Sequence, residues 1–333
     1  MIQRCPYKRK LLVAIGILLA LSGMALMVGR YPMSLEELGE VLLGRDTTSS
    51  LYTLIMQIRL PRIVIVILSG GALSLAGTIY QGLFQNPLVS PDVLGVSSGC
   101  GVGAILAILF FPRFPHALQM MAFCGGIVAV TLALIMARMS KANKLLGLVI
   151  AGIVISSVAS AITMLLKYGA DPYKQLPTIE FWLMGGFYKA NWERFGLIWP
   201  SIGVGIVTLF ILRWPLKVLT LGDEEAATLG VNVKSIRIIA IGAVTLLVAA
   251  VVSVAGVISW IGLVAPHIVK LLVGNNLEKE MPMSLCMGAG LLLLADTLAR
   301  SLYAAEIPVS VLTTFVGAPF LAHLLYQRGR AEQ

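Results

Sequence analysis

Long apolar segments separated by short polar ones follow one another along the whole chain. Ten of them approach the ~20 residues that an α-helix needs to cross ~30 Å of hydrocarbon. They run roughly over 11–30, 61–84, 93–111, 117–137, 145–167, 195–212, 236–258, 260–274, 281–299 and 307–327. The eighth is the shortest, and none alternates as a barrel strand does. The pattern predicts an all-α polytopic membrane protein with about ten transmembrane helices, and an even number places both termini on one side.

Composition supports this class and excludes others. The 333 residues are 58% hydrophobic and only 12% charged, whereas a soluble domain carries about 25% charged residues. Such a chain cannot cover its surface with polar groups, which excludes a soluble enzyme. Its net charge of +9 is spread over mostly apolar segments, so we expect no nucleic-acid partner.

The distribution of basic residues predicts the orientation. Arg4, Lys8, Arg9 and Lys10 precede the first apolar segment, which is too long for the apolar part of a signal peptide. We interpret it as the first transmembrane helix with its basic flank in the cytoplasm. In that orientation 15 of the 25 lysines and arginines lie on the inner side, as the positive-inside rule favours. Both termini are then cytoplasmic.

Two segments outside the spans carry local signals. In the first outer loop, Ser34 is a candidate N-cap for a short amphipathic helix ending near Leu43, with Glu37 three residues on. Separately, residues 88–93 (LVSPDV) resemble residues 263–268 (LVAPHI), 175 residues and five spans later. An odd number of spans places the copies on opposite faces, which predicts an inverted repeat within a single transmembrane domain covering 1–333.

The spans lack the residues that intramembrane chemistry requires. There is no HExxH, no aspartate cluster, no CxxC pair and no P-loop in the sequence. Asp296 is the carboxylate nearest to a mid-span position, and Arg300 follows at i+4, which favours a structural ion pair at the outer end of the ninth span. We therefore expect no catalytic residue, no metal site and no cofactor bound by this chain.

The inner loop at 213–235 contains the most informative stretch, residues 221–230 (LGDEEAATLG). Three acidic residues suit the positive end of a helix, two alanines favour helix, and Gly230 suits its end. About two turns of helix are predicted, too short to be stable without a partner. It is either a surface helix of the loop or a peg that docks into a cytoplasmic protein.

Nine short segments occur in one order along nearly the whole chain: Arg59-Leu-Pro-Arg62, Gln85-Asn-Pro-Leu88, Leu94-Gly-Val-Ser-Ser98, Asp171-Pro172, Phe181-Trp-Leu-Met-Gly185, Leu221-Gly222 through Leu229-Gly230, Gly262-Leu-Val-Ala-Pro-His267, Ala295-Asp-Thr-Leu-Ala-Arg300 and Gly317-Ala-Pro319. In them the chain resembles the FecCD-type permeases of binding-protein-dependent ABC importers, which include cobalamin, ferric-siderophore and haem importers. The resemblance implies that family's ten-helix permease fold in a bacterial or archaeal cytoplasmic membrane.

The resemblance also implies partners and roles. The family forms a homodimer on two cytoplasmic ATPase subunits, which use ATP and Mg²⁺, and it receives cargo from a periplasmic or lipid-anchored substrate-binding protein. The loop at 222–230 resembles its coupling helix, and the residues implied in ATPase coupling are Gly222, Asp223, Glu224, Glu225, Ala226, Leu229 and Gly230. Arg59, Arg62 and Arg300 resemble the outer arginines that receive acidic residues of the binding protein. Alternatively, they anchor helix ends in lipid headgroups. Asn143 and Lys144 resemble the inner gate.

Together these features predict the permease subunit of an ATP-driven importer that moves a metal chelate, most specifically a ferric siderophore, by alternating access. Cobalamin, haem or molybdate remain alternatives within the family. A carrier driven by an ion gradient would need a titratable mid-span residue, and an intramembrane enzyme would need a metal or nucleophile motif. Neither is found in the sequence.

Overall fold

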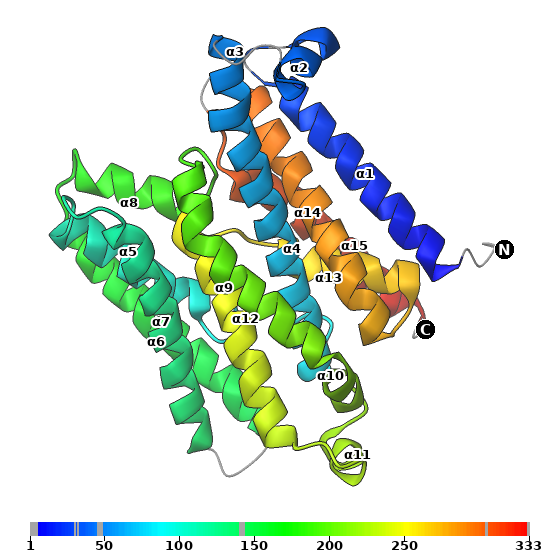
Figure 1. Ribbon diagram of the computed structural model, residues 1–333. Helices are drawn as coiled ribbons and strands as arrows, with labels where there is room; N and C mark the ends of the chain where they lie inside the picture. The colour runs from blue at the N-terminus through cyan, green and yellow to red at the C-terminus, as the bar shows by residue number, and fades with distance from the viewer. Residues whose placement is uncertain are drawn as a thin grey trace. The chain divides into compact units, whose positions relative to one another are not determined.

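The computed structural model describes residues 6–29, 31, 33–44, 49–139, 144–303 and 306–331, and helices follow one another along all of these segments (Figure 1). The helices are α1 (Tyr7–Met27), α2 (Leu35–Leu42), α3 (Ser50–Thr53), the π-helical η1 (Leu54–Arg59), α4 (Leu60–Leu83), α5 (Val96–Phe110), α6 (Ala117–Arg138), α7 (Lys144–Tyr168), α8 (Gln175–Leu183), α9 (Trp192–Ile211), α10 (Arg213–Leu219), α11 (Asp223–Thr228), α12 (Val233–Ala255), α13 (Ile261–Val273), α14 (Leu277–Ser301) and α15 (Val309–Ala331). No strand occurs within the described ranges.

Each of the ten predicted spans coincides with one helix: α1, α4, α5, α6, α7, α9, α12, α13, α14 and α15. Among the described residues, seven helical segments are long and apolar enough to cross a membrane. The apolar helices Val96–Phe110, Ile261–Val273 and Val309–Ala322 are shorter. The fold class is therefore confirmed as an all-α protein with helices suited to a membrane.

The chain divides into two compact units, which we describe separately. Unit 1 comprises Met1–Thr78, Phe187–Trp199 and Ser259–Gln333, and unit 2 comprises Ile79–Gly186 and Pro200–Ile258. In unit 1, α14 packs against α1, α13 and α15. A buried hydrogen bond of 2.6 Å between the hydroxyls of Thr78 and Ser284 joins α4 to α14. Polar pairs of this kind satisfy side chains that hydrocarbon would leave without partners.

Unit 2 is built around a close approach of α5 and α6. A Cβ added to Gly99 would lie 2.4 Å from the carbonyl oxygen of Gly125, and one added to Gly103 would lie 2.0 Å from that of Met121. Only glycine permits this backbone contact, which explains the GxxxGxxxG pattern that starts at Gly95. Helices α7 and α12 pack on the same pair.

Two local predictions have different outcomes. The capping box at α2 is confirmed: the N–H of Ser34 donates to Oε2 of Glu37 (2.7 Å) and the N–H of Glu37 donates to Oγ of Ser34 (3.2 Å). By contrast, the two similar hexapeptides differ in conformation, because residues 88–93 form turns between α4 and α5 while residues 263–268 lie inside α13. The inverted repeat and the single domain therefore remain predictions.

Candidate functional site

The short helix in the loop between α10 and α12 forms where the sequence predicts it. Helix α11 (Asp223–Thr228) begins after Gly222, whose φ of 139° disfavours any other residue. It ends before Gly230, whose φ of 79° is left-handed. There the N–H of Gly230 donates to the carbonyl of Ala227 and the N–H of Val231 to that of Ala226, both at 3.0 Å. These bonds satisfy carbonyls at the helix end.

One face of α11 is fixed to its own unit. Ala226 is fully buried, and Nη2 of Arg237 on α12 donates to Oδ1 of Asp223 at 2.6 Å. Arg237 is only 7% exposed. Asp223 therefore holds α11 against α12. The sequence places Arg237 only among the inner basic residues, because nothing local indicates a partner 14 residues away.

The other face of α11 is open. Glu224 and Glu225 are exposed, and the apolar side chains that flank the helix, Leu221 and Leu229, are 65% and 56% exposed. Two acidic groups between two exposed leucines give a surface with both charge and apolar area. Such a combination suits a protein partner better than it suits water alone.

A buried charge cluster lies in unit 1, where α4 meets α14. The guanidinium of Arg62 donates to both oxygens of Asp296, at 2.9 to 3.2 Å. It also donates to both oxygens of Glu306, at 2.9 and 3.0 Å. Asp296 is 1% exposed. Arg62 is thus the cation that compensates a carboxylate buried among apolar helices.

The neighbouring arginines bind the end of α1. Arg59 donates to the carbonyls of Leu26, Met27 and Tyr31, and Arg300 donates to that of Ala25. The last carbonyls of a helix have no partner within it, so these guanidinium groups satisfy them. Nε of Arg300 also lies 4.0 Å from Oδ2 of Asp296, which confirms the predicted i,i+4 pair as the weaker of the two pairs that Asp296 makes.

The structure thus brings the three implied docking arginines together in unit 1. Arg59, Arg62 and Arg300 are 5%, 9% and 8% exposed, and each has partners within the chain. Binding-protein docking by these residues remains a prediction, and it would require their side chains to exchange internal partners. Of the implied inner gate, Asn143 lies outside the described residues, and Lys144 is the first residue of α7. Gating also remains a prediction.

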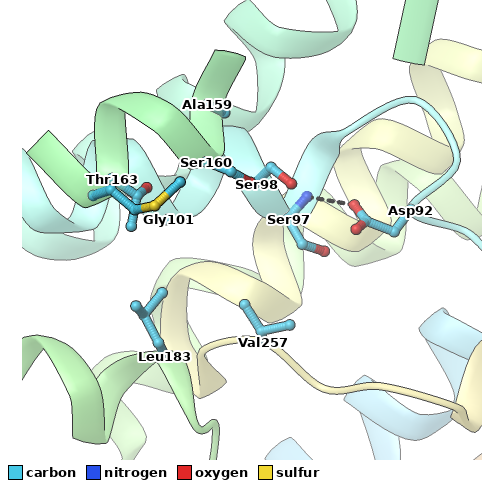
Figure 2. Close-up of a pocket in the computed structure, with 10 residues that line it drawn as sticks. Asp92, Ser97, Ser98, Gly101, Ala159, Ser160, Thr163, Leu183 and Val257 are labelled. Carbon is cyan, nitrogen blue, oxygen red and sulfur yellow. Dashed lines mark hydrogen bonds between the residues drawn. The ribbon is translucent and has the colours of Figure 1, made fainter. Parts of the chain in front are cut away.

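Unit 2 contains a cavity of about 300 Å³ between α5, α7 and α8, with both polar and apolar side chains in its lining (Figure 2). It is lined by Asp92, Ser97, Ser98, Gly101, Ala159, Ser160, Thr163, Met164, Leu183 and Val257. A second hollow of about 600 Å³ shares three of these residues and adds Ser156 and Ser157. On α7, Ser156, Ser160 and Thr163 are spaced by four and three residues, so they share one helix face. No lysine or arginine lines either space in the described chain.

Asp92 supplies the charge in this cavity. Its Oδ1 accepts the N–H of Ser97 at 2.7 Å (Figure 2). The pKa of the Asp92 carboxyl is raised above its usual value, because burial outweighs the opposing hydrogen bonds from Ser97. Figure 2 shows Leu183 and Val257 on the side of the cavity away from Thr163 and Ser160. This site was not predicted from the sequence, although the spacing of Ser156, Ser160 and Thr163 within an apolar segment is a signal for it.

Apolar helices of membrane-spanning length, a hydroxyl-lined cavity and a short exposed helix in a loop define a polytopic membrane transport subunit. Comparison with known proteins specifies it further. The model of the FecCD transport family matches residues 14–327, and the chain belongs to this family.

Curated relatives agree with that membership. The chain is 37% identical to the molybdate import system permease protein MolB of Haemophilus influenzae over 329 residues, 96% of each chain. It is 37% identical to the Fe(3+)-citrate import system permease protein YfmE of Bacillus subtilis, covering 99% of this chain and 98% of the relative. It is 36% identical to the hemin transport system permease protein HmuU of Yersinia pestis, covering 85% and 86%.

A solved structure described as an inward-facing conformation of a metal-chelate type ABC transporter has a TM-score of 0.87 to this chain. It is 35% identical and covers 96% of this chain and 99% of its own. The resemblance stated from the sequence is therefore confirmed: the chain is a FecCD-type permease of an ABC importer. Its family is a transport family, and its role requires an ATPase and a binding protein as partners.

Proposed function

We propose that this permease passes a ferric siderophore across the cytoplasmic membrane, with the cavity of unit 2 in contact with the cargo. The observation that supports this most directly is the chemistry of the lining. The lining includes hydroxyl groups of α5 and α7 and a single carboxylate, and no cation lines the cavity in the described chain. Relatives named for Fe(3+)-citrate and hemin agree with a chelate as cargo.

Hydroxyl groups suit such a cargo because each one both donates and accepts hydrogen bonds. A polar chelate that leaves water needs replacement partners, since a polar group buried without a hydrogen bond is costly. Ser160 and Thr163 supply such partners without binding one geometry tightly. The face they form on α7 continues through Ser156 into the second hollow, which extends the polar surface along the helix.

Molybdate is the second candidate, because a molybdate permease is 37% identical over 96% of the chain. A bare oxyanion is bound most strongly by cationic donors. Asp92 would instead repel it when the carboxyl is ionised. The cavity chemistry therefore favours the chelate over the oxyanion.

We also propose the assembly. Two copies of the chain form a homodimer, both termini face the cytoplasm, and two ATPase subunits bind the open face of α11. Glu224, Glu225, Leu221 and Leu229 are the contact residues, because they are exposed while Asp223 and Ala226 are engaged within unit 2. ATP and Mg²⁺ belong to the ATPases, and this chain binds no cofactor of its own.

Uptake assays test the cargo. Cells that lack only this subunit are complemented with the wild-type chain and supplied with radiolabelled ferric siderophores, haem, cobalamin or molybdate. We expect restored uptake of a ferric siderophore. Uptake of molybdate alone would contradict the proposal.

A matched pair of isosteric variants tests the cavity. Thr163→Val removes a hydroxyl from the lining, and we expect uptake to fall about fivefold, because one hydrogen bond contributes about 1 kcal/mol. Thr131→Val on α6 removes a hydroxyl whose bond is to Ile127 of its own helix, at an exposed position, and should leave uptake unchanged. Equal effects of both variants would exclude a cargo contact at Thr163.

A further inference from the structure

Unit 1 contains an apolar groove between α1 and α14 that the transport function does not use. Its volume is about 490 Å³. On α1 the lining begins at Arg9 and reaches Leu21, a rise of about 18 Å along the helix. Beyond the two basic residues at its start, the lining is aliphatic and sulfur-containing, and Met287 and Gly290 contribute to it from α14.

The charge of the groove is confined to one end. Arg9 is exposed there, and Lys10 is partly buried with its Nζ donating to the carbonyl of Leu272 at 2.7 Å. No aspartate or glutamate is among the described residues that line the groove. Two cations therefore stand at the mouth of an otherwise uncharged hydrocarbon surface, with no anion of the lining to neutralise them.

We propose that this groove is a binding site for one anionic phospholipid, with an acyl chain between α1 and α14 and the phosphate against Arg9 and Lys10. The ligand must carry hydrocarbon along its length and negative charge at one end, which is the chemistry of such a lipid. Helix α1 exposes Leu12, Ile15 and Leu19 on its other faces, so it lies against lipid already. Basic pockets between transmembrane helices bind anionic headgroups in the same way.

Native mass spectrometry of the purified full-length chain in detergent tests the site. The probes are phosphatidylglycerol and phosphatidylcholine with identical acyl chains. We expect phosphatidylglycerol to bind about thirtyfold more tightly, because each cation near an anionic headgroup contributes about fivefold in affinity. Arg9→Gln should lower that preference about fivefold, and Arg9→Gln/Lys10→Gln should abolish it.

Lys8→Gln is the matched control for charge. Lys8 is exposed on the same turn of α1 but does not line the groove, so its replacement should leave the preference for phosphatidylglycerol unchanged. If Lys8→Gln lowers the preference as much as Arg9→Gln does, the binding is a diffuse surface effect and the site is refuted.

Gly290→Leu tests the acyl-chain part independently of charge. A Cβ at Gly290 meets Leu21 Cδ1 at 3.7 Å, an ordinary contact, so a side chain can begin there without a backbone clash, and Gly290 lines the groove that the leucine would fill. We expect it to lower binding of both lipids, with an unchanged gel-filtration profile. The proposal would be overturned if this variant still bound phosphatidylglycerol as the wild type does. It would also be overturned if the wild type bound the two lipids equally, or if inorganic phosphate displaced the lipid. If the double variant misfolds, the lipid binding of Arg9→Gln and Gly290→Leu alone tests the site.

Discussion

Replacing Arg62 by alanine should destabilise this permease more than any change at a surface charge. The substitution leaves Asp296, which is 1% exposed, without the guanidinium that now donates to both its oxygens. Removing one partner of a buried ion pair costs about 3 to 5 kcal/mol. Glu306 adds little to this sum, because its side chain is 28% exposed and water can replace the arginine.

The measurement is reversible unfolding of the purified chain in mixed micelles by titration with sodium dodecyl sulfate, followed by circular dichroism. Arg62→Lys keeps the charge but loses the bidentate geometry, so we expect an intermediate loss. Arg62→Leu/Asp296→Leu removes both charges and should be more stable than Arg62→Ala, since the fully buried carboxylate is then gone and only the partly exposed Glu306 loses its partner.

Two results would refute this reasoning. One is an Arg62→Ala variant that loses less than about 1 kcal/mol, the range of exposed pairs. The other is a double variant no more stable than Arg62→Ala, because the loss would then come from packing and not from the unpaired carboxylate.

Three further predictions concern α11 and the cavity. Glu224→Lys/Glu225→Lys should lower co-purification of the ATPase about tenfold by reversing the exposed charge, and unchanged co-purification would count against the docking role. Arg237→Leu should lower cargo-stimulated ATP hydrolysis several-fold in reconstituted vesicles. The free energy of unfolding should change by only about 1 kcal/mol, since Asp223 is 45% exposed and can be hydrated. Unchanged cargo-stimulated hydrolysis would show that α11 does not need to be held by Arg237. Asp92→Asn keeps an acceptor for the N–H of Ser97 but removes the negative charge. Molybdate uptake should therefore rise, and siderophore uptake should stay within about twofold of the wild type. A fall in molybdate uptake would contradict the role of Asp92 in the cavity.

The features that the sequence predicted correctly depend on neighbours along the chain. A membrane span is recognised from about 20 consecutive residues, the capping box at Ser34 from four, and α11 from its acidic start and Gly230. Because hydrogen bonds within a helix satisfy the backbone locally, hydrocarbon requires these elements wherever the apolar segments occur. The ten apolar helices could therefore be predicted without any tertiary contact, and seven of them are long enough to span a membrane.

The pairings that the sequence did not predict join residues far apart in the chain. Arg62 and Asp296 are 234 positions apart, and Arg59 reaches carbonyls about 30 positions away, at the end of α1. A single sequence contains no periodicity that links such positions. The hydroxyl face of α7 was visible as a pattern, but the helices that face it and the cavity between them are set by packing within unit 2.

The arginine cluster decides how a docking experiment must be designed. Reversing Arg59 and Arg62 to glutamate would be expected to impair uptake under either interpretation, since the same substitutions remove hydrogen-bond donors from the end of α1 and the bidentate partner of Asp296. Loss of uptake alone therefore cannot assign a docking role. Two variants together separate the interpretations, because Arg62→Lys keeps a positive charge at position 62 and Arg62→Leu/Asp296→Leu removes it. If Arg62 docks the binding protein, the lysine variant keeps the docking affinity and the double leucine variant loses it. If both variants dock the binding protein normally, Arg62 serves the fold of unit 1 and the binding protein is received elsewhere.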